Sequence, residues 1–485
     1  MLVVGLALSI AGLAGCSGDE PSDRPTPEAT PATTAGPRLS ATPCSRADGT
    51  IVPCGLQVPS TVWLVDARDG AVRTVYESDT GVVRSADFDN ATGEAILGVE
   101  PEAGSDLLEA IRFNPDGAET GREPWPTDAK DRGNALLLMR VWRPGDPFCL
   151  TVDGGAEVNG RRYDGIACGP VSPDGRWMTY GAQTDEVDAA GRPILGGDVW
   201  AIDLTSDERW QVQAGLRSCQ GDSFFRAEWS PSGRYWFFGD CRDGGRIFLS
   251  DMVRRATRQI GTGLPVMRSR PDWSPAADVL LYQGNGGVTV LEDFRTGALT
   301  SLFTVGWPAR FDVAGAYVYS PPGATPRQES PGGPTTIFEV ASGRVVAALP
   351  GRAVYPDLYL GYESLAGTGS GFVAALQEAP GCDGTAVYAG ATLAVCVKGA
   401  AGAVVSPGGR YVALARKTGE TGLAHFPGGG SVSMNRYEIV VVNVSTGTER
   451  VVAKDALGLT HPPLAGAWNA EGTHFLVSWP FSYGP

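Results

Sequence analysis

The chain repeats the stretch Ser-Pro-Asp-Gly-Arg-Trp, found at 172–177, between apolar runs, and this repeat is the strongest indication of its fold. Proline presets the backbone for a turn and glycine accepts a positive φ, so the stretch predicts a tight turn between antiparallel strands. Two further full copies begin at 230 and 406, and degraded copies begin at 88, 274, 311 and 468. The turn residues of the full copies are Ser172, Pro173, Asp174 and Gly175; Ser230, Pro231 and Gly233; and Ser406, Pro407 and Gly409.

A second type of hairpin alternates with these turns. It reads Val-Trp-Leu-Val-Asp followed by Asp-Gly within 62–70, and Val-Trp-Ala-Ile-Asp at 199–203. Hairpins of this type are expected near 61–76, 107–118, 198–213, 244–260, 286–303, 334–349, 385–399 and 436–453. Four strands per unit, at a spacing of roughly 40 to 60 residues, predict an all-β protein that forms a single β-propeller.

The Ser-Pro-Asp-Gly-Arg-Trp turn resembles the WD40-like repeats of TolB-type propellers, which also occur in the propeller domains of prolyl-oligopeptidase-like enzymes. The resemblance covers about residues 60–485 and implies an architecture, not an activity. TolB-like proteins carry an additional N-terminal domain, for which the segment before the repeats leaves no space. A TolB role is therefore not carried over.

The eight hairpins predict eight blades. Seven is the close alternative, because 353–399 lacks the Ser-Pro-x-Gly turn and 130–168 adds strand-like material. The repeats begin with the last two strands of a unit and end just after 475–479, the second strand of a unit. The two chain ends are expected to share one blade, which closes the ring and leaves no open sheet edge.

The N-terminal segment predicts export and a lipid anchor. Residues 2–13 are apolar or small except Ser9, and the run is too short for a permanent membrane helix. Its end, Leu-Ala-Gly-Cys at 13–16, resembles the lipobox of bacterial lipoproteins. The resemblance implies a signal peptide at 1–15 and acyl chains, including palmitate, on Cys16. No Lys or Arg precedes the run, which leaves open a start upstream of Met1.

Residues 16–43 are expected to be an extended tether, because Pro, Thr, Ala and Ser dominate there and cannot bury a core. The propeller domain is then expected to span 44–485. A net charge of -15 argues against a nucleic-acid partner and against electrostatic attachment to anionic lipid. Basic residues that are nearly all Arg, with abundant Ala and Gly, indicate a high-GC genome such as that of an actinobacterium.

Eight cysteines remain beside Cys16, and they form four local pairs, each nearly symmetric about turn-forming residues. Cysteines equidistant from a hairpin turn face each other across two strands, so four sequential disulfides and an oxidising compartment are predicted. The pairs are Cys44–Cys54, Cys149–Cys168, Cys219–Cys241 and Cys382–Cys396. A metal site is disfavoured, because the sequence has no C-x-x-C and only three His.

No motif indicates a catalytic residue, a cofactor or a metal. The sequence has no G-x-S-x-G, P-loop or H-E-x-x-H, and the chain leaves no room for a separate hydrolase domain. The docking motif of eight-bladed quinone-dependent dehydrogenases is matched only distantly, at 203–210. The three histidines are scattered at His425, His461 and His474.

Two acidic groups and the tryptophans are candidate ligand sites. The acidic groups are Asp185, Glu186 and Asp188, and Asp240 with Asp243. No Asp-x-Asp-x-Asp spacing occurs, so solvated loops are favoured over calcium sites. Trp229, Trp273 and Trp468 lie beside the inner turns, which favours packing between blades over a platform for carbohydrate.

These observations favour a non-catalytic binding or scaffold module for an envelope protein or a cell-wall glycan. The long loops 183–198, 320–335 and 417–436 are expected to form its recognition surface. The alternative is a propeller hydrolase or lyase with its active site at the mouth of the central channel. Converging His, Glu and Asp side chains would support the enzyme, whereas scattered His and an apolar channel would contradict it.

Overall fold

The computed structural model consists almost entirely of β-strands, which confirms the all-β prediction. It describes residues 40–45, 51–57, 60–89, 92–102, 109–124, 149–152, 154–166, 168–183, 196–217, 228–240, 246–262, 271–284, 288–302, 309–320, 334–353, 364–425, 431–458 and 464–479. These residues form 37 strands and include one short 3₁₀ turn, η4, at Pro407–Gly409. None of the helical structure described has the length and apolar character needed to span a membrane.

Most sheets are antiparallel meanders of consecutive strands. The four-stranded sheets are β5-β6-β7-β8 (Val82–Phe88, Ala95–Glu100, Glu109–Phe113, Glu119–Pro124), β15-β16-β17-β18 (Glu228–Trp229, Tyr235–Asp240, Arg246–Asp251, Ala256–Thr262), β19-β20-β21-β22 (Asp272–Trp273, Val279–Gln283, Thr289–Asp293, Ala298–Leu302), β23-β24-β25-β26 (Arg310–Phe311, Tyr317–Ser320, Thr335–Glu339, Arg344–Leu349) and β36-β37-β3-β4 (Leu464–Trp468, His474–Trp479, Ser60–Asp66, Val72–Ser78).

The other sheets depart from four strands. The three-stranded sheets are β11-β10-β9 (Arg161–Asp164, Gly155–Val158, Cys149–Val152) and β12-β13-β14 (Trp177–Gln183, Gly196–Asp203, Arg209–Arg217). The larger sheets are β27-β29-β30-β31 (Arg352–Ala353, Gly371–Gln377, Gly384–Ala389, Thr392–Lys398), with β28 (Leu365–Thr368) beside β29, and β1-β2-β33-β34-β35 (Ser40–Ser45, Ile51–Gln57, Tyr411–His425, Ser431–Asn443, Thr448–Gly458), with β32 (Ala400–Val405) beside β33.

Every outer hairpin expected from the sequence is present as a pair of neighbouring strands. The pairs are β3–β4, β7–β8, β13–β14, β17–β18, β21–β22, β25–β26, β30–β31 and β34–β35. The sheet β9-β10-β11 comes in addition, within the region that carries extra strand-like sequence. It packs through Val158, Tyr163 and Ile166 against Met178 and Ile202 of β12 and β13.

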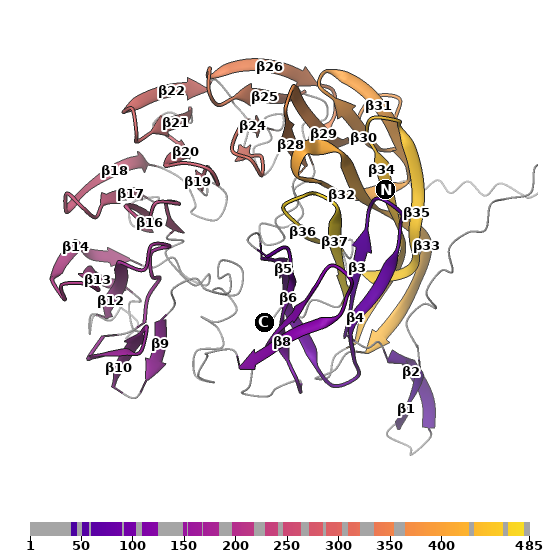
Figure 1. The fold of residues 1–485 in the computed structure, drawn as a ribbon, viewed down its shortest axis with the longest axis horizontal. Helices are drawn as coiled ribbons and strands as arrows, with labels where there is room; N and C mark the ends of the chain where they lie inside the picture. Colours follow the sequence, from indigo (N-terminus) through magenta and orange to yellow (C-terminus); the bar gives the residue numbers. More distant parts are fainter. Residues whose placement is uncertain are drawn as a thin grey trace, which may run out of the picture.

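Neighbouring sheets pack face to face, and Figure 1 shows them following one another around a common centre. One apolar cluster joins Trp236 and Phe238 of β16 to Trp177 of β12, and another joins Phe237 to Leu280 of β20. Strand β16 is buried at all of its positions, because it is covered on both faces. This explains why the inner strands have continuous apolar sequences without polar alternation.

The first and last strands of the repeats share the sheet β36-β37-β3-β4. Strands β37 and β3 pair antiparallel from Thr61 opposite Trp479 to Asp66 opposite His474. The sheet packs on β32–β35 through one apolar cluster and on β5–β8 through another. The shared blade expected from the sequence is therefore present.

The described parts of the segment 417–436 are strand residues of β33 and β34 and not a loop, contrary to the expectation from the Gly-rich sequence. Strands β33 and β34 pair up to Lys417 opposite Tyr437 and pair again from Thr421 opposite Asn435 to His425 opposite Ser431. A register shift separates the two stretches and absorbs the extra residues. Strand β2 also pairs in parallel with the end of β33, so this sheet exceeds the four strands expected of a blade.

Candidate binding face

The inner turns, which join the first and second strands of a sheet, share one hydrogen-bond pattern. In the copy at 172–177 the backbone N–H of Ser172 donates to the carbonyl of Trp177 at 2.8 Å. In return, Ser172 Oγ accepts the backbone N–H of Trp177 at 2.8 Å. The same exchange links Ser230 with Tyr235 and Ser406 with Tyr411. The turn glycines Gly175, Gly233 and Gly409 have φ of 68°, 72° and 68°, as the turn requires.

Two degraded copies keep this pattern with other side chains. Asp312 Oδ1 accepts the N–H of Tyr317 at 2.8 Å, and Asn469 Oδ1 accepts the N–H of His474 at 2.8 Å. Serine is thus one of three residue types that supply the acceptor oxygen at this position.

The arginine of the turn connects the inner turn to the outer turn of the same sheet. Arg176 lies 3.0 Å from Asp203, and Arg234 lies 2.8 Å from Asp251. Each guanidinium also stacks over the next aromatic ring, at 4.4 Å for Trp177 and 4.9 Å for Tyr235. The inner and outer turns thus lie together, and we name the side of the molecule that carries them the turn face.

Inner turns of neighbouring sheets also touch. Ser232 donates its backbone N–H and its hydroxyl to Asp278, at 3.1 Å and 2.6 Å. A Cβ added to Gly233 would lie 2.6 Å from Asp174 Oδ1, and one added to Gly315 would lie 2.3 Å from Ser274 Oγ. Packing between sheets therefore fixes the residues of the turn face.

The opposite side carries the connections between second and third strands, because successive connections of a meander alternate between the two ends of the strands. We name it the connection face. The three segments expected to form a recognition surface all connect a second strand to a third: β12 to β13, β24 to β25, and β33 to β34. Residues 184–195, 321–333 and 426–430 of these segments lie outside the described residues.

The extended ribbon of β33, β34 and β35 is one described part of the connection face. Met434, Tyr437 and Leu457 are buried in the apolar cluster that includes Leu464 and Trp468 of the shared sheet. Burial raises the pKa of Tyr437. Ion pairs tie the three strands: Arg416–Glu449 at 2.8 Å, Arg416–Glu438 at 3.5 Å, Arg436–Asp455 at 3.2 Å and Lys454–Glu438 at 3.8 Å.

Two disulfides are present, with the pairing expected from the sequence: Cys149–Cys168 and Cys382–Cys396. Their surroundings differ from the expected facing positions on a hairpin. Cys382 lies in the short connection before β30, and Cys149 and Cys168 enclose the three strands β9, β10 and β11. Cys16 and the pair Cys219–Cys241 lie outside the described residues, and the side chains of Cys44 and Cys54 are not described.

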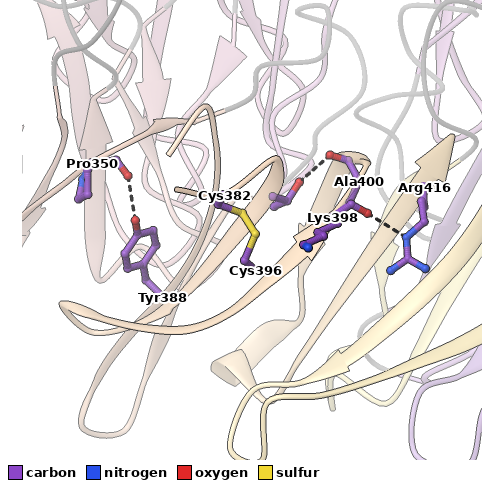
Figure 2. Close-up of a disulfide and its surroundings, with 8 residues drawn as sticks. Pro350, Cys382, Tyr388, Cys396, Lys398, Ala400 and Arg416 are labelled. Atoms are coloured by element: carbon purple, nitrogen blue, oxygen red, sulfur yellow. Dashed lines mark hydrogen bonds between the residues drawn. A yellow bond between two sulfur atoms is a disulfide. The ribbon is translucent and has the colours of Figure 1, made fainter. Parts of the chain in front are cut away.

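The Cys382–Cys396 bond secures the connection-face end of β30 and β31, and hydrogen bonds tie this hairpin to both neighbouring sheets (Figure 2). The hydroxyl of Tyr388 donates to the carbonyl of Pro350 at 3.0 Å on one side. Arg416 Nε donates to the carbonyl of Lys398 at 3.0 Å on the other.

The innermost strands carry charged side chains beside the packed tryptophans. Trp229 and Trp273 donate their indole N–H to the carbonyls of Pro170 and Glu228, both at 3.2 Å, so they join neighbouring sheets as expected. Arg310 lies 3.4 Å from Asp272, whose second oxygen accepts the N–H of Phe311 at 3.0 Å. Among the described residues, no three metal-ligating side chains come together.

Of the five acidic residues that are candidate calcium ligands, only Asp240 lies among the described residues. Asp240 is fully buried and pairs with Arg246, so its carboxylate neutralises a cation of its own sheet. Asp185, Glu186, Asp188 and Asp243 lie outside the described residues, as does His461, and the side chain of His425 is not described.

Sequence reasoning missed a buried polar group around His474. His474 Nε2 lies 3.5 Å from Asp66 Oδ2, and its Nδ1 lies 3.0 Å from Thr473 Oγ1. Burial lowers the pKa of His474. Asp66 raises this pKa, whereas Arg68 and Arg73 lower it further. The signal was available, because His474 takes the place of the turn aromatic in the degraded copy that begins at 468.

No protein-family model matches the chain, and a search of curated proteins gives no match. Among solved structures, a TolB from Agrobacterium tumefaciens is 11% identical, with a TM-score of 0.29, covering 87% of this chain and 99% of that one. The β-propeller domain of the Trilobed protease from Pyrococcus furiosus is 10% identical, with a TM-score of 0.31, covering 78% of this chain and 96% of that one.

A puromycin hydrolase is 16% identical, with a TM-score of 0.33, covering 65% of this chain and 56% of that one. These TM-scores are low, and the fold assignment rests on the sheets, their order and the apolar clusters between them. The chain folds as a β-propeller.

Proposed function

We propose that this propeller is a non-catalytic binding or scaffold module whose partner, an envelope protein or a cell-wall glycan, contacts the connection face. The observation that carries the proposal is the contrast between the two faces. Contacts between sheets fix the residues of the turn face, whereas the longest connections begin and end on the other side. Binding residues are concentrated on such connections, because a rigid scaffold can vary them without losing its core.

The proposal includes extracytoplasmic attachment to the cell membrane through acyl chains on Cys16. The topology supports a particular orientation. Strand β1 starts at Ser40 opposite Gln57, and Gln57 pairs with His425 at the far end of β33. The tether therefore joins the folded part at the connection face, so a partner bound there would lie near the membrane.

The proposal also includes a closed ring of eight blades, with β9-β10-β11 as an added sheet. Eight sheets carry an outer hairpin. One of them is the sheet shared by the chain ends, which packs between β32–β35 and β5–β8. A crystal structure would count the blades, and a ring of seven or nine would contradict this part.

Site-specific photocrosslinking in intact cells tests the binding face. Lys417 and Thr446 are both exposed and lie in one sheet, Lys417 toward the connection face and Thr446 in the outer turn of the turn face. A crosslinker at Lys417 should yield one discrete adduct, and a crosslinker at Thr446 should yield none. Adducts only at Thr446, or at neither position, would contradict the proposal.

Two further measurements address the anchor and the enzyme alternative. Cells fed an alkyne fatty acid should label the wild-type chain but not a Cys16→Ser variant, which should leave the membrane fraction. Turnover by the purified protein on a panel of ester, lactone and glycoside substrates would instead establish the hydrolase or lyase.

A further inference from the structure

His474 occupies the place where the two ends of the repeat array meet. It is the first residue of β37 and lies opposite Asp66, the last residue of β3. At the equivalent position five other sheets place Trp177, Tyr235, Val279, Tyr317 and Tyr411, opposite Asp203, Asp251, Asp293, Glu339 and Asn443. A titratable imidazole therefore replaces an aromatic or aliphatic side chain at the seam between β37 and β3.

The hydrogen bonds around the ring suit the neutral imidazole. Nδ1 can accept from the hydroxyl of Thr473 at 3.0 Å, and Nε2–H then points toward Asp66 Oδ2 at 3.5 Å. The amide nitrogen of Asn469 lies 3.4 Å from Nδ1, and its orientation is fixed because Asn469 Oδ1 accepts the N–H groups of Thr473 and His474, both at 2.8 Å. A proton on Nδ1 would face this N–H donor.

A second proton would give the buried ring a positive charge, and the charged groups around it do not offset the cost of burying that charge. His474 is 5% exposed and Asp66 is 5% exposed. Asp66 is already held by Arg68, which donates to both carboxylate oxygens at 3.0 Å and 2.6 Å. Asp66 and Asp69 favour the imidazolium, whereas burial, Arg68 in the turn and Arg73 in β4 oppose it. A buried charge with a partner that is already neutralised is costly.

We propose that the seam between β37 and β3 is a pH-sensitive latch, closed while His474 is neutral and weakened when His474 is protonated. The direction follows from linkage. Burial lowers the pKa of His474 below its ordinary value of 6.5, so the unfolded or opened chain binds the proton more readily than the closed seam. The contribution of His474 to stability is complete above pH 6.5 and is lost as the pH falls from there through the lower pKa of the closed seam.

The test compares the wild-type chain with a His474→Tyr variant, which installs the residue that Tyr235 and Tyr411 provide in other sheets. Melting temperatures are measured between pH 8 and pH 5, above the range in which aspartates titrate. The wild type should lose several degrees over this interval, and the variant should lose much less. A His425→Gln/His461→Gln variant should keep the wild-type loss, because it retains His474.

Hydrogen exchange in the wild type locates the effect without relying on a variant. At pH 5.5, after correction for intrinsic rates, amides of β3 and β37 should exchange several-fold faster than at pH 7.5, while those of β16 and β17 should not change. Equal pH dependence in wild type and His474→Tyr, or uniform acceleration across the sheets, would overturn the latch.

Discussion

In five inner turns, a side-chain oxygen of the turn accepts the N–H with which the second strand begins. Ser230 is fully buried, and its Oγ accepts the N–H of Tyr235 at 3.1 Å, so the backbone group of a buried residue depends on it. We expect Ser230→Ala to lower the free energy of unfolding by about 1–3 kcal/mol, because a buried N–H loses its partner. Ser230→Asn should recover most of this, since Asn469 fills the same role. Urea unfolding midpoints measure both, and equal losses would contradict the acceptor role.

The left-handed glycine of the turn is constrained by its neighbour as well as by its own backbone. Gly233 has φ of 72° and its added Cβ would lie 2.6 Å from Asp174 Oδ1, whereas Gly160 has φ of 75° with open space around it. Gly160→Ala should cost about 1 kcal/mol from the backbone alone. Gly233→Ala should cost roughly twice that, and Asp174→Ala should relieve part of it. Equal losses at the two glycines, again from urea unfolding, would show that the neighbouring sheet does not matter.

Residue types in the sequence predict these turns well, because their local chemistry is sufficient to form them. The Pro and Gly positions and the three Trp beside the turns have the expected roles, whereas the acceptor role of Ser was not expected. His474 was missed as a site because its environment is assembled from residues 66 and 68 at the other end of the chain. The sequence shows a histidine in place of the turn aromatic, but spacing along the chain cannot reveal that residues 66 and 68 surround it.

Within one sheet, the turn arginine holds two hairpins together. Asp251 has a pKa below its ordinary value of 3.8, because bonds from Arg234 and from the N–H of Arg254 outweigh the effect of burial, which raises it. The contribution of Asp251 is thus complete above pH 3.8 and is lost as the pH falls through the lower folded-state value. Arg234→Met should weaken the protein at neutral pH and flatten its stability profile below about pH 4. Urea unfolding at pH 7 and pH 3 measures this, with Arg344→Met, at an exposed arginine of β26, as control.

A disulfide stabilises one hairpin at its connection-face end. Cys382 and Cys396 are separated by 14 residues, for which loop-closure entropy gives about 3 kcal/mol. Replacing both by alanine should lower the unfolding midpoint, and dithiothreitol should lower the wild type by more than the variant. If dithiothreitol lowered the two equally, this bond would not contribute.

Hairpins were predictable as elements because turn chemistry and apolar runs repeat along the chain. The segment 417–436 was mistaken for a loop because its glycines obscure a ribbon that is held from outside by β35 and β2. Two cysteine pairs were predicted correctly from symmetry, although neither pair faces across a simple hairpin. The symmetry reflects closeness in sequence, which brings the cysteines together under several local geometries.

At the scale of the whole molecule, the seam between β37 and β3 replaces an ordinary connection. Strand β37 ends at Trp479 beside Thr61 of β3, so the two strands meet as second and third strands do elsewhere. A circular permutant should therefore fold, if residues 479 and 60 are joined by a short Gly-rich linker and new ends are placed within 263–270. The linker can match the span from Gln283 to Thr289, which connects β20 and β21.

The permutant should unfold cooperatively, with a stability near that of the parent chain 60–479, because the sheets and the clusters between them are unchanged. As a matched control, deletion of 474–479 should prevent folding, since it removes Phe475, Leu476 and Val477 from the two clusters on either side of the shared sheet. Near-ultraviolet circular dichroism and urea unfolding distinguish these outcomes. If the parent chain folded but the permutant gave no tertiary signal, a covalent connection could not substitute for the free chain ends at the seam.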